Sequence, residues 1–335
     1  MERTRRWPNT SNEVSWNFRR KEDEFTRFSG HKCFVESCSF SPDGSLLATA
    51  SGDEKIIIWN IEQAIELFAL QGHRSTIWSC EFSPDSINPL LCSCSSDRTV
   101  RVWNLEERSE IAVMRQHKNT VWTCRFCPTN NTTIASGSSD MLIVIWDFIE
   151  DAVIRVLEGH SDVIEDISFS PNNNATIASA SRDRTIRLWK NWLYPETTEC
   201  STLLGHEARV TCCVYSPLND GRLLSASADR TIRVWDSDNG EELIRMEGHS
   251  NIIWRCCFLL YQDCVLIASC SSDRTLRIWD SKSGSELKTY RDLDSHTDPK
   301  AQLLYCACSS NRLAVTSYEG GVYVARTAEL IHDVL

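Results

Sequence analysis

Histidine, serine and aspartate are the residues of this chain best suited to acid–base or nucleophilic chemistry, and they recur in a fixed order. Successive histidines are 42, 44, 43, 46 and 43 residues apart, and each leads to an aspartate that a tryptophan follows six residues later. A catalytic or metal site needs such groups to converge. A period in the low forties instead places one set in each of several repeated units. The sets begin at His31, His73, His117, His160, His206 and His249; the aspartates are Asp53, Asp97, Asp140, Asp183, Asp229 and Asp273; the tryptophans are Trp59, Trp103, Trp146, Trp189, Trp235 and Trp279.

The repetition favours a structural role for these histidines, and the chain contains no competing catalytic motif. It has no glycine-rich phosphate loop, no HExxH and no GxSxG sequence. Among sixteen cysteines, the one CxxC pair is Cys124 and Cys127, whose side chains would point to opposite faces of a strand. We therefore expect no enzymatic activity, no cofactor and no metal, and buried reduced thiols of the kind found inside the cell.

The residues between two histidines are typical of four short strands. In the unit that begins at His73, β-branched and apolar runs predict strands at 77–82, 90–95, 99–103 and 110–114. Turn sequences such as Ser83-Pro84-Asp85 and Ser96-Asp97-Arg98 separate them. An apolar residue stands at the fourth and at the ninth position after each histidine. We therefore expect the six sheets to pack in the same way.

A seventh, degenerate unit follows, with strands expected at 303–308, 312–317 and 321–325. Glu319 replaces its turn aspartate and Ala325 replaces its tryptophan. Residues 24–28 resemble the missing fourth strand, so we expect them to close a ring of seven blades, because a radial array that stayed open would leave two apolar faces in water. The predicted organisation is a polar arm at 1–23, an all-β propeller of four-stranded antiparallel blades at 24–326, and a short tail at 327–335.

These residues resemble the WD-repeat β-propeller family over about residues 25–326. The family's hydrogen-bonded tetrad maps in the second unit onto His73, Ser95, Asp97 and Trp103. The departures are Gln116 in place of the glycine before a histidine, and Asn60, Asn104 and Lys190 after a tryptophan. The resemblance implies a seven-bladed propeller that presents its loops to other macromolecules.

The fifth position after each histidine is not periodic, and in the family it opens onto the top face around the central channel. It holds Glu36, Trp78, Trp122, Glu165, Thr211 and Trp254. Exposed aromatic clusters mark binding sites. Trp78, Trp122 and Trp254 are therefore predicted to bind a partner, the alternative being that they pack against neighbouring loops.

In the family the aspartate turns lie on the same face, so the resemblance implies that arginines add positive charge to it. Four of them follow the turn aspartates directly, and a fifth precedes Asp183: Arg98, Arg184, Arg230, Arg274 and Arg182. Together with the tryptophans they suit an acidic or phosphorylated peptide. The alternative is that they are ordinary turn residues paired with nearby carboxylates.

The functional hypothesis is a non-enzymatic protein-interaction scaffold or adaptor that binds a peptide segment on its top face, monomeric alone and part of a multiprotein complex. One alternative is a substrate receptor of a ubiquitin ligase, because the segment from Trp279 to Lys282 resembles the family's docking sequence. Another is a nucleic-acid or chromatin module, which a net charge of -11 disfavours. The chain has no signal peptide or membrane-spanning run, so we expect the cytoplasm or the nucleus.

Overall fold

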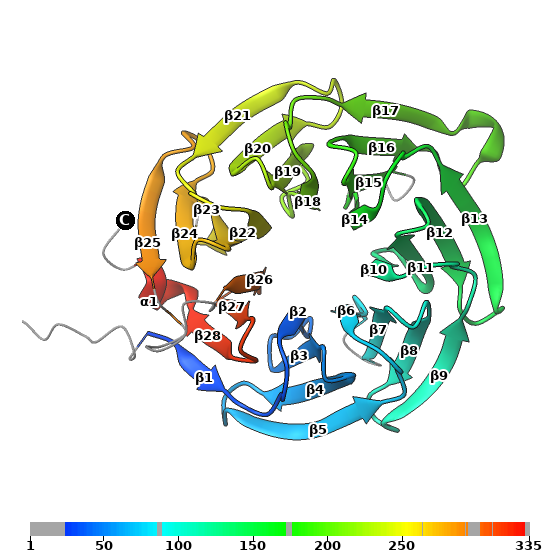
Figure 1. The fold of residues 1–335 in the computed structure, drawn as a ribbon, viewed down its shortest axis with the longest axis horizontal. Coiled ribbons are helices and arrows are strands. Elements are labelled where there is room, and N and C mark those ends of the chain that lie inside the picture. Colours follow the sequence, from blue (N-terminus) through cyan, green and yellow to red (C-terminus); the bar gives the residue numbers. More distant parts are fainter. Residues whose placement is uncertain are drawn as a thin grey trace, which may run out of the picture.

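The chain forms a closed ring of seven four-stranded antiparallel sheets, as the computed structural model shows (Figure 1). The structure describes residues 24–85, 89–171, 176–262, 264–291, 293, 302–309 and 311–331. The prediction of an all-β, seven-bladed propeller is confirmed. The expected arm at 1–23 and the last four residues of the expected tail, 332–335, lie outside the described residues.

Each of the first six blades consists of four strands that are consecutive in the chain. The first strand lies at the central channel and the fourth lies at the outer edge. Blades 1 to 3 are β2 (Val35–Phe40), β3 (Leu46–Ser51), β4 (Lys55–Asn60) and β5 (Ile65–Gln71); β6 (Ile77–Phe82), β7 (Leu90–Ser95), β8 (Val100–Asn104) and β9 (Ser109–Met114); β10 (Val121–Cys127), β11 (Asn130–Ser138), β12 (Leu142–Asp147) and β13 (Ala152–Glu158). Blades 4 to 6 are β14 (Ile164–Phe169), β15 (Thr176–Ser181), β16 (Ile186–Lys190) and β17 (Glu199–Leu203); β18 (Val210–Tyr215), β19 (Arg222–Ser227), β20 (Thr231–Asp236) and β21 (Glu242–Glu247); β22 (Ile253–Tyr261), β23 (Cys264–Ser271), β24 (Thr275–Asp280) and β25 (Glu286–Arg291). A 3₁₀ turn, Pro195–Thr197, precedes β17.

The seventh blade joins the two ends of the described chain. It contains β26 (Leu303–Cys308), β27 (Arg312–Ser317) and β28 (Val322–Arg326), and β1 (Thr26–Phe28) pairs with β28 as its outer strand. The N-terminal strand therefore closes the ring, as the sequence predicts. A short helix follows, α1 (Thr327–Ile331), and its Leu330 and Ile331 are buried in the core shared by blades 6 and 7.

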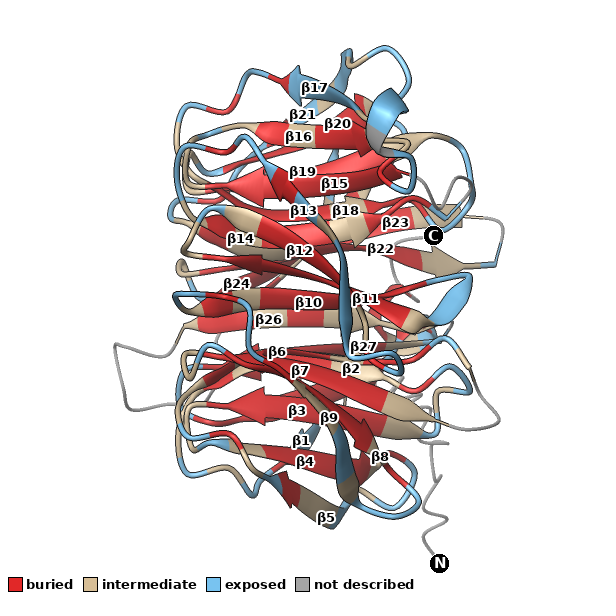
Figure 2. Cartoon of the chain, turned by 90° about the vertical axis from the view of Figure 1, so that its right-hand side faces the viewer, coloured by how far each residue is buried: buried red, intermediate tan, exposed pale blue. Residues whose placement is uncertain are grey.

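The hydrophobic core lies between neighbouring blades, which is why burial extends through the whole ring (Figure 2). Between blades 1 and 2, for example, Ile56 and Ile58 of β4 pack in one cluster with Ile77 of β6 and Trp103 of β8. Each sheet thus covers the face of the next sheet, and the closed ring leaves no open face.

A chain of hydrogen bonds fixes each of the first six blades, and the second blade is typical. Trp103 Nε1 donates to the Ser93 hydroxyl, Ser93 donates to His73 Nε2, and His73 Nδ1 donates to Asp97, at 2.8, 2.8 and 2.9 Å. The prediction that Ser95 is the tetrad serine is therefore wrong. Ser95 lies at the end of β7, where its hydroxyl donates to the carbonyl of Ser75 and accepts from the backbone N–H of Asp97.

Candidate functional site

A β-bulge interrupts every inner strand at the same point, and it explains why the fifth position after each histidine differs from its neighbours. The register of all seven inner pairs shifts there, so one residue of each inner strand has no opposite partner. A bulge bends the strand and redirects the extra side chain. The bulge residues are Glu36, Trp78, Trp122, Glu165, Thr211, Trp254 and, in the seventh blade, Leu304.

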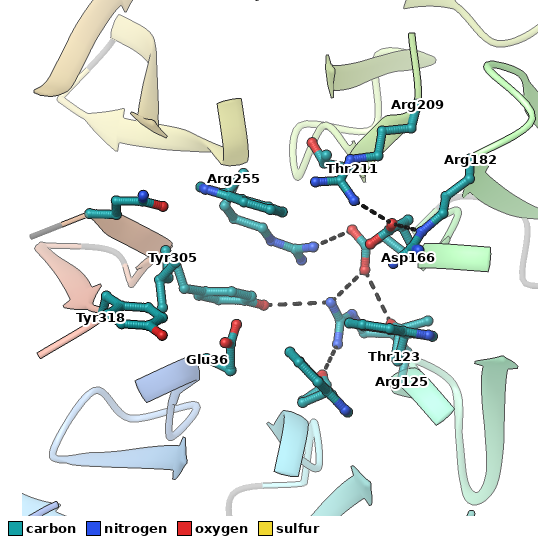
Figure 3. Close-up of a pocket in the computed structure, with 17 residues that line it drawn as sticks. Glu36, Thr123, Arg125, Asp166, Arg182, Arg209, Thr211, Arg255, Tyr305 and Tyr318 are labelled. Carbon is teal, nitrogen blue, oxygen red and sulfur yellow. Dashed lines mark hydrogen bonds and ion pairs between the residues drawn. The ribbon is translucent and has the colours of Figure 1, made fainter. Parts of the chain in front are cut away.

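All seven bulge residues line one cavity of about 270 Å³ in the central channel. The histidine loops and the aspartate turns lie on this side of the ring, which we call the top face. Residues next to the bulges complete the walls and the floor, among them Thr123, Asp166, Arg255 and Tyr305 (Figure 3). The ring therefore brings together, in one place, residues from all seven blades.

The three predicted tryptophans all line this cavity, and each is half-buried. Their indole N–H groups donate to serine hydroxyls of Ser96, Ser139 and Ser272, at 2.7, 2.6 and 2.6 Å. The rings of Trp78 and Trp122 also contact each other, with centroids 4.2 Å apart. The indoles are thus held in fixed positions while part of their surface stays accessible.

Two arginines cover tryptophan faces from the side of blades 4 and 5. Arg182 lies 5.0 Å from the ring centroid of Trp122, and Arg209 lies 4.9 Å from that of Trp254. Both guanidinium groups also pair with the same carboxylate, Glu165. Of the five predicted arginines, Arg182 alone lines the cavity.

The floor of the cavity is an ionic cluster around Asp166, whose side chain is 1% exposed. Arg125 reaches this carboxylate from blade 3 at 2.8 Å, and Arg255 reaches it from blade 6 (Figure 3). The Thr123 hydroxyl and the backbone N–H of Cys213 donate to the same carboxylate, both at 3.1 Å. Burying charges is costly unless they are paired and hydrogen-bonded, and this cluster satisfies both conditions.

The cluster lies between two cavities of the channel. Arg125 and Arg255 also line a second cavity of about 240 Å³ on the opposite side, where Glu81 pairs with Arg125. Burial raises the pKa of Glu81 to about 7, although the charge of Arg125 acts against the rise. The sequence interpretation missed this cluster, although its signal was available: Asp166 and Arg255 stand at a position where the other four histidine-led repeats carry serine, threonine or cysteine.

A family model of the WD domain, G-beta repeat, matches residues 23–60, 65–104, 108–147, 152–190, 197–236 and 240–280, which together make up more than half of the chain. This chain belongs to the WD-repeat family. No curated protein matches it. Propellers of WD repeats are typically protein-interaction scaffolds and are generally not enzymes. Within the described residues, no helix is both long and apolar enough to cross a membrane.

The other four predicted arginines of this WD-repeat protein lie outside the cavity. Arg98, Arg184, Arg230 and Arg274 are exposed in the turns between the second and third strands of their blades, with φ between 67° and 72°. None of them forms an ion pair with another described residue. They make up a separate set of free positive charges, which we call the rim arginines.

The six tetrads occupy the histidines in hydrogen bonds within the blades. In each of the six WD-repeat tetrads, both ring nitrogens of the histidine are hydrogen-bonded. Burial would raise the pKa of Asp53, but hydrogen bonds from His31 and from the backbone N–H of Lys32 lower it to about 2. Among the described residues there is no cluster of three or more metal-binding side chains, and all sixteen cysteines are free thiols.

Proposed function

We propose that this WD-repeat protein is a non-enzymatic scaffold that binds a peptide segment of a protein partner in the top cavity. The observation that supports the proposal is which residues occupy the seven bulge positions. Seven positions equivalent by fold hold three tryptophans, two glutamates, a threonine and a leucine. The scaffold does not require these differences, since the blades around them are alike.

Rigid display would be the mechanism of binding. The tryptophans are held by hydrogen bonds to serines, and Arg182 and Arg209 are held by Glu165. Side chains that are already ordered lose little entropy when a partner binds. Tryptophan and arginine are also the residues that most often dominate binding energy at interfaces.

The rim arginines would act at a distance from the cavity. Because they are exposed and form no ion pair with any residue that the structure describes, they attract acidic or phosphorylated residues that flank the inserted segment. Exposed charges mainly raise the rate of association, so we assign them to steering and the tryptophans to affinity.

The test is a paired affinity purification with quantitative mass spectrometry. The intact chain is compared with a triple variant, Trp78→Ala, Trp122→Ala and Trp254→Ala. The control is a triple variant on the outer strands, Ile65→Ala, Ile111→Ala and Ile154→Ala, whose side chains are 41–48% exposed. Both variants are first shown to melt cooperatively. We expect the tryptophan variant alone to lose a partner set; equal recovery by all three baits would overturn the proposal.

The sixteen free thiols support a reducing compartment, the cytoplasm or the nucleus. The ubiquitin-ligase alternative depends on Lys282, which is exposed in the turn after β24. The nucleic-acid alternative depends on the rim arginines alone. It would require binding that weakens steeply with salt.

A further inference from the structure

The two bulge carboxylates, Glu36 and Glu165, differ in their partners. Glu36 lies on β2 of blade 1 and points into the top cavity (Figure 3). It forms no hydrogen bond or ion pair with another described residue. Glu165, the equivalent residue of blade 4, pairs with both Arg182 and Arg209. Of these two carboxylates at equivalent positions, Glu165 is therefore paired with arginines and Glu36 is not.

The residue just before each turn aspartate accounts for this difference. In blades 2, 3 and 6 it is a serine that holds the bulge tryptophan, and in blade 4 it is Arg182, which holds Glu165. In blade 1 it is Gly52, which has no side chain to offer. A Cβ at Gly52 would lie 2.6 Å from the ring of Phe34, so Phe34 already fills this space. Blade 1 thus leaves its bulge carboxylate available.

The neighbours of Glu36 around the ring are aromatic. Trp78 follows in blade 2, and Tyr305 and Tyr318 belong to blade 7, all three lining the same cavity. Tyr318 stacks on Phe34 with ring centroids 5.5 Å apart and is 49% exposed. A carboxylate between aromatic side chains is a suitable environment for a cation, because ring faces attract positive charge.

From these observations we infer that Glu36 binds a lysine or arginine side chain of the partner segment, which inserts into the top cavity between Trp78 and Tyr305. The inference rests on the proposed function and names the chemistry of its occupant. An anionic side chain is a less suitable occupant of the cavity, because the four arginines of the cavity already have carboxylate partners. Asp166 holds Arg125 and Arg255, and Glu165 holds Arg182 and Arg209.

The electrostatics of Glu36 supports a pH-dependent form of this binding. Burial, and then the negative charge of Glu165, raise the pKa of Glu36 to about 7. The other charged or titratable groups of the cavity are Arg125, Asp166, Arg182, Arg209, Arg255, Tyr305 and Tyr318. A bound cation stabilises the ionised carboxylate, so affinity for a basic side chain should increase as the pH rises from 6 to 8.

The experiment uses a random peptide library with one central position fixed as lysine, arginine, norleucine, glutamate or phosphoserine. Each sublibrary is passed over the full chain, over Glu36→Gln and over the tryptophan triple variant. Glu207→Gln is the matched control, since Glu207 is exposed on the top face outside the cavity. We expect the full chain to retain the lysine or arginine sublibrary about tenfold more than norleucine at pH 8, the factor a charged hydrogen bond supplies. Glu36→Gln should abolish this preference, and Glu207→Gln should keep it.

The outcomes separate this inference from the proposed function. At pH 6 the preference of the full chain for a basic side chain should be several-fold smaller than at pH 8. The retention by Glu36→Gln should not change in this way between the two pH values. The tetrad histidines are present in both proteins, so their titration cannot cause the difference. Retention without a basic preference, or with a preference for glutamate or phosphoserine, would overturn the role of Glu36 alone. Retention of no sublibrary above the level of the tryptophan triple variant would count against both.

Discussion

The tetrads and the top cavity both contain polar side chains that need hydrogen-bond or ion-pair partners. The two regions supply these partners in different ways. Each tetrad closes its hydrogen bonds inside one blade, from Trp103 through Ser93 and His73 to Asp97. The cavity satisfies most of its charges between blades, as when Asp166 of blade 4 holds arginines from blades 3 and 6. The tetrads therefore specify a blade, whereas the cavity depends on the complete ring.

The two regions also differ in what they leave unsatisfied. Both ring nitrogens of every tetrad histidine are bonded, whereas Glu36 has no hydrogen-bond or ion-pair partner within the described part of the chain. The repeats give each blade the same hydrogen-bonded arrangement. A site that is specific to this protein therefore has to be formed by positions that vary between blades. In this ring, those positions are the bulges.

The largest effect is expected from Asp166→Asn. The variant leaves the guanidinium groups of Arg125 and Arg255 without their shared charge. We expect the free energy of unfolding to fall by about 3–5 kcal/mol, the usual result of breaking a buried ion pair. Urea unfolding followed by fluorescence measures it. Asp238→Asn on an exposed loop is the control, with a change within about 0.5 kcal/mol. Equal effects would mean that the cluster does not stabilise the ring.

A tetrad substitution should have a smaller effect. Ser93→Ala removes the hydroxyl shared by Trp103 and His73 and should lower the free energy of unfolding by about 1–3 kcal/mol, because two buried groups lose a partner. Ser93→Thr should remain close to the unmodified protein, since Thr49 fills this place in blade 1. If Ser95→Ala proved more damaging than Ser93→Ala, our assignment of the tetrad serine would be contradicted.

The carboxylates of the two regions should respond to pH in opposite directions. The pKa of Asp53 is lowered to about 2, so its contribution to stability is present above about pH 4, where the unfolded carboxyl ionises, and is lost as the pH falls to about 2. The pKa of Glu36 is raised from 4.5 to about 7, so stability decreases as the pH rises through that interval.

Glu36→Gln tests this contrast in the absence of a partner. The substitution removes the cost of ionising a half-buried carboxyl, and we expect a gain of about 1–2 kcal/mol in unfolding free energy at pH 8. At pH 5 the folded carboxyl is mostly protonated, and the gain should be much smaller. Urea titrations at the two pH values measure the difference. A loss of stability at pH 8 would show that Glu36 has a structural partner.

The smallest effect is expected at the rim. Replacing Arg98, Arg184, Arg230 and Arg274 together by glutamine should slow association with the partner about threefold at low salt, because steering by exposed charges is a rate effect. The difference should disappear near 0.5 M salt, where the Debye length is only a few ångströms. Surface plasmon resonance separates the rates. A slower rate that persists in high salt would assign these arginines to direct contacts.

The sequence could predict the blades because every repeat marks the same points. His73, Asp97 and Trp103 define where a sheet begins, turns and ends, and six repeats agree. The choice between Ser93 and Ser95 could not be made this way. Both serines point to the same face of β7, and the position of the tryptophan N–H decides between them.

The candidate site was less accessible to sequence reasoning. The tryptophans stand out because they break the repeat, but the cluster of Asp166, Arg125 and Arg255 joins three blades that are far apart in the chain. Its pairing depends on the diameter of the closed ring, which no local pattern encodes. Likewise, the free state of Glu36 depends on Gly52, sixteen residues later, and on the ring of Phe34.

The most direct test of the central claim is hydroxyl-radical footprinting of the twelve tryptophans with and without the partner recovered by the purification. The six tetrad tryptophans are buried and provide an internal standard. We predict that binding protects Trp78, Trp122 and Trp254 from oxidation and leaves the tetrad tryptophans unchanged. Unchanged oxidation of those three while the partner is bound would contradict the account and locate the interface elsewhere on the ring.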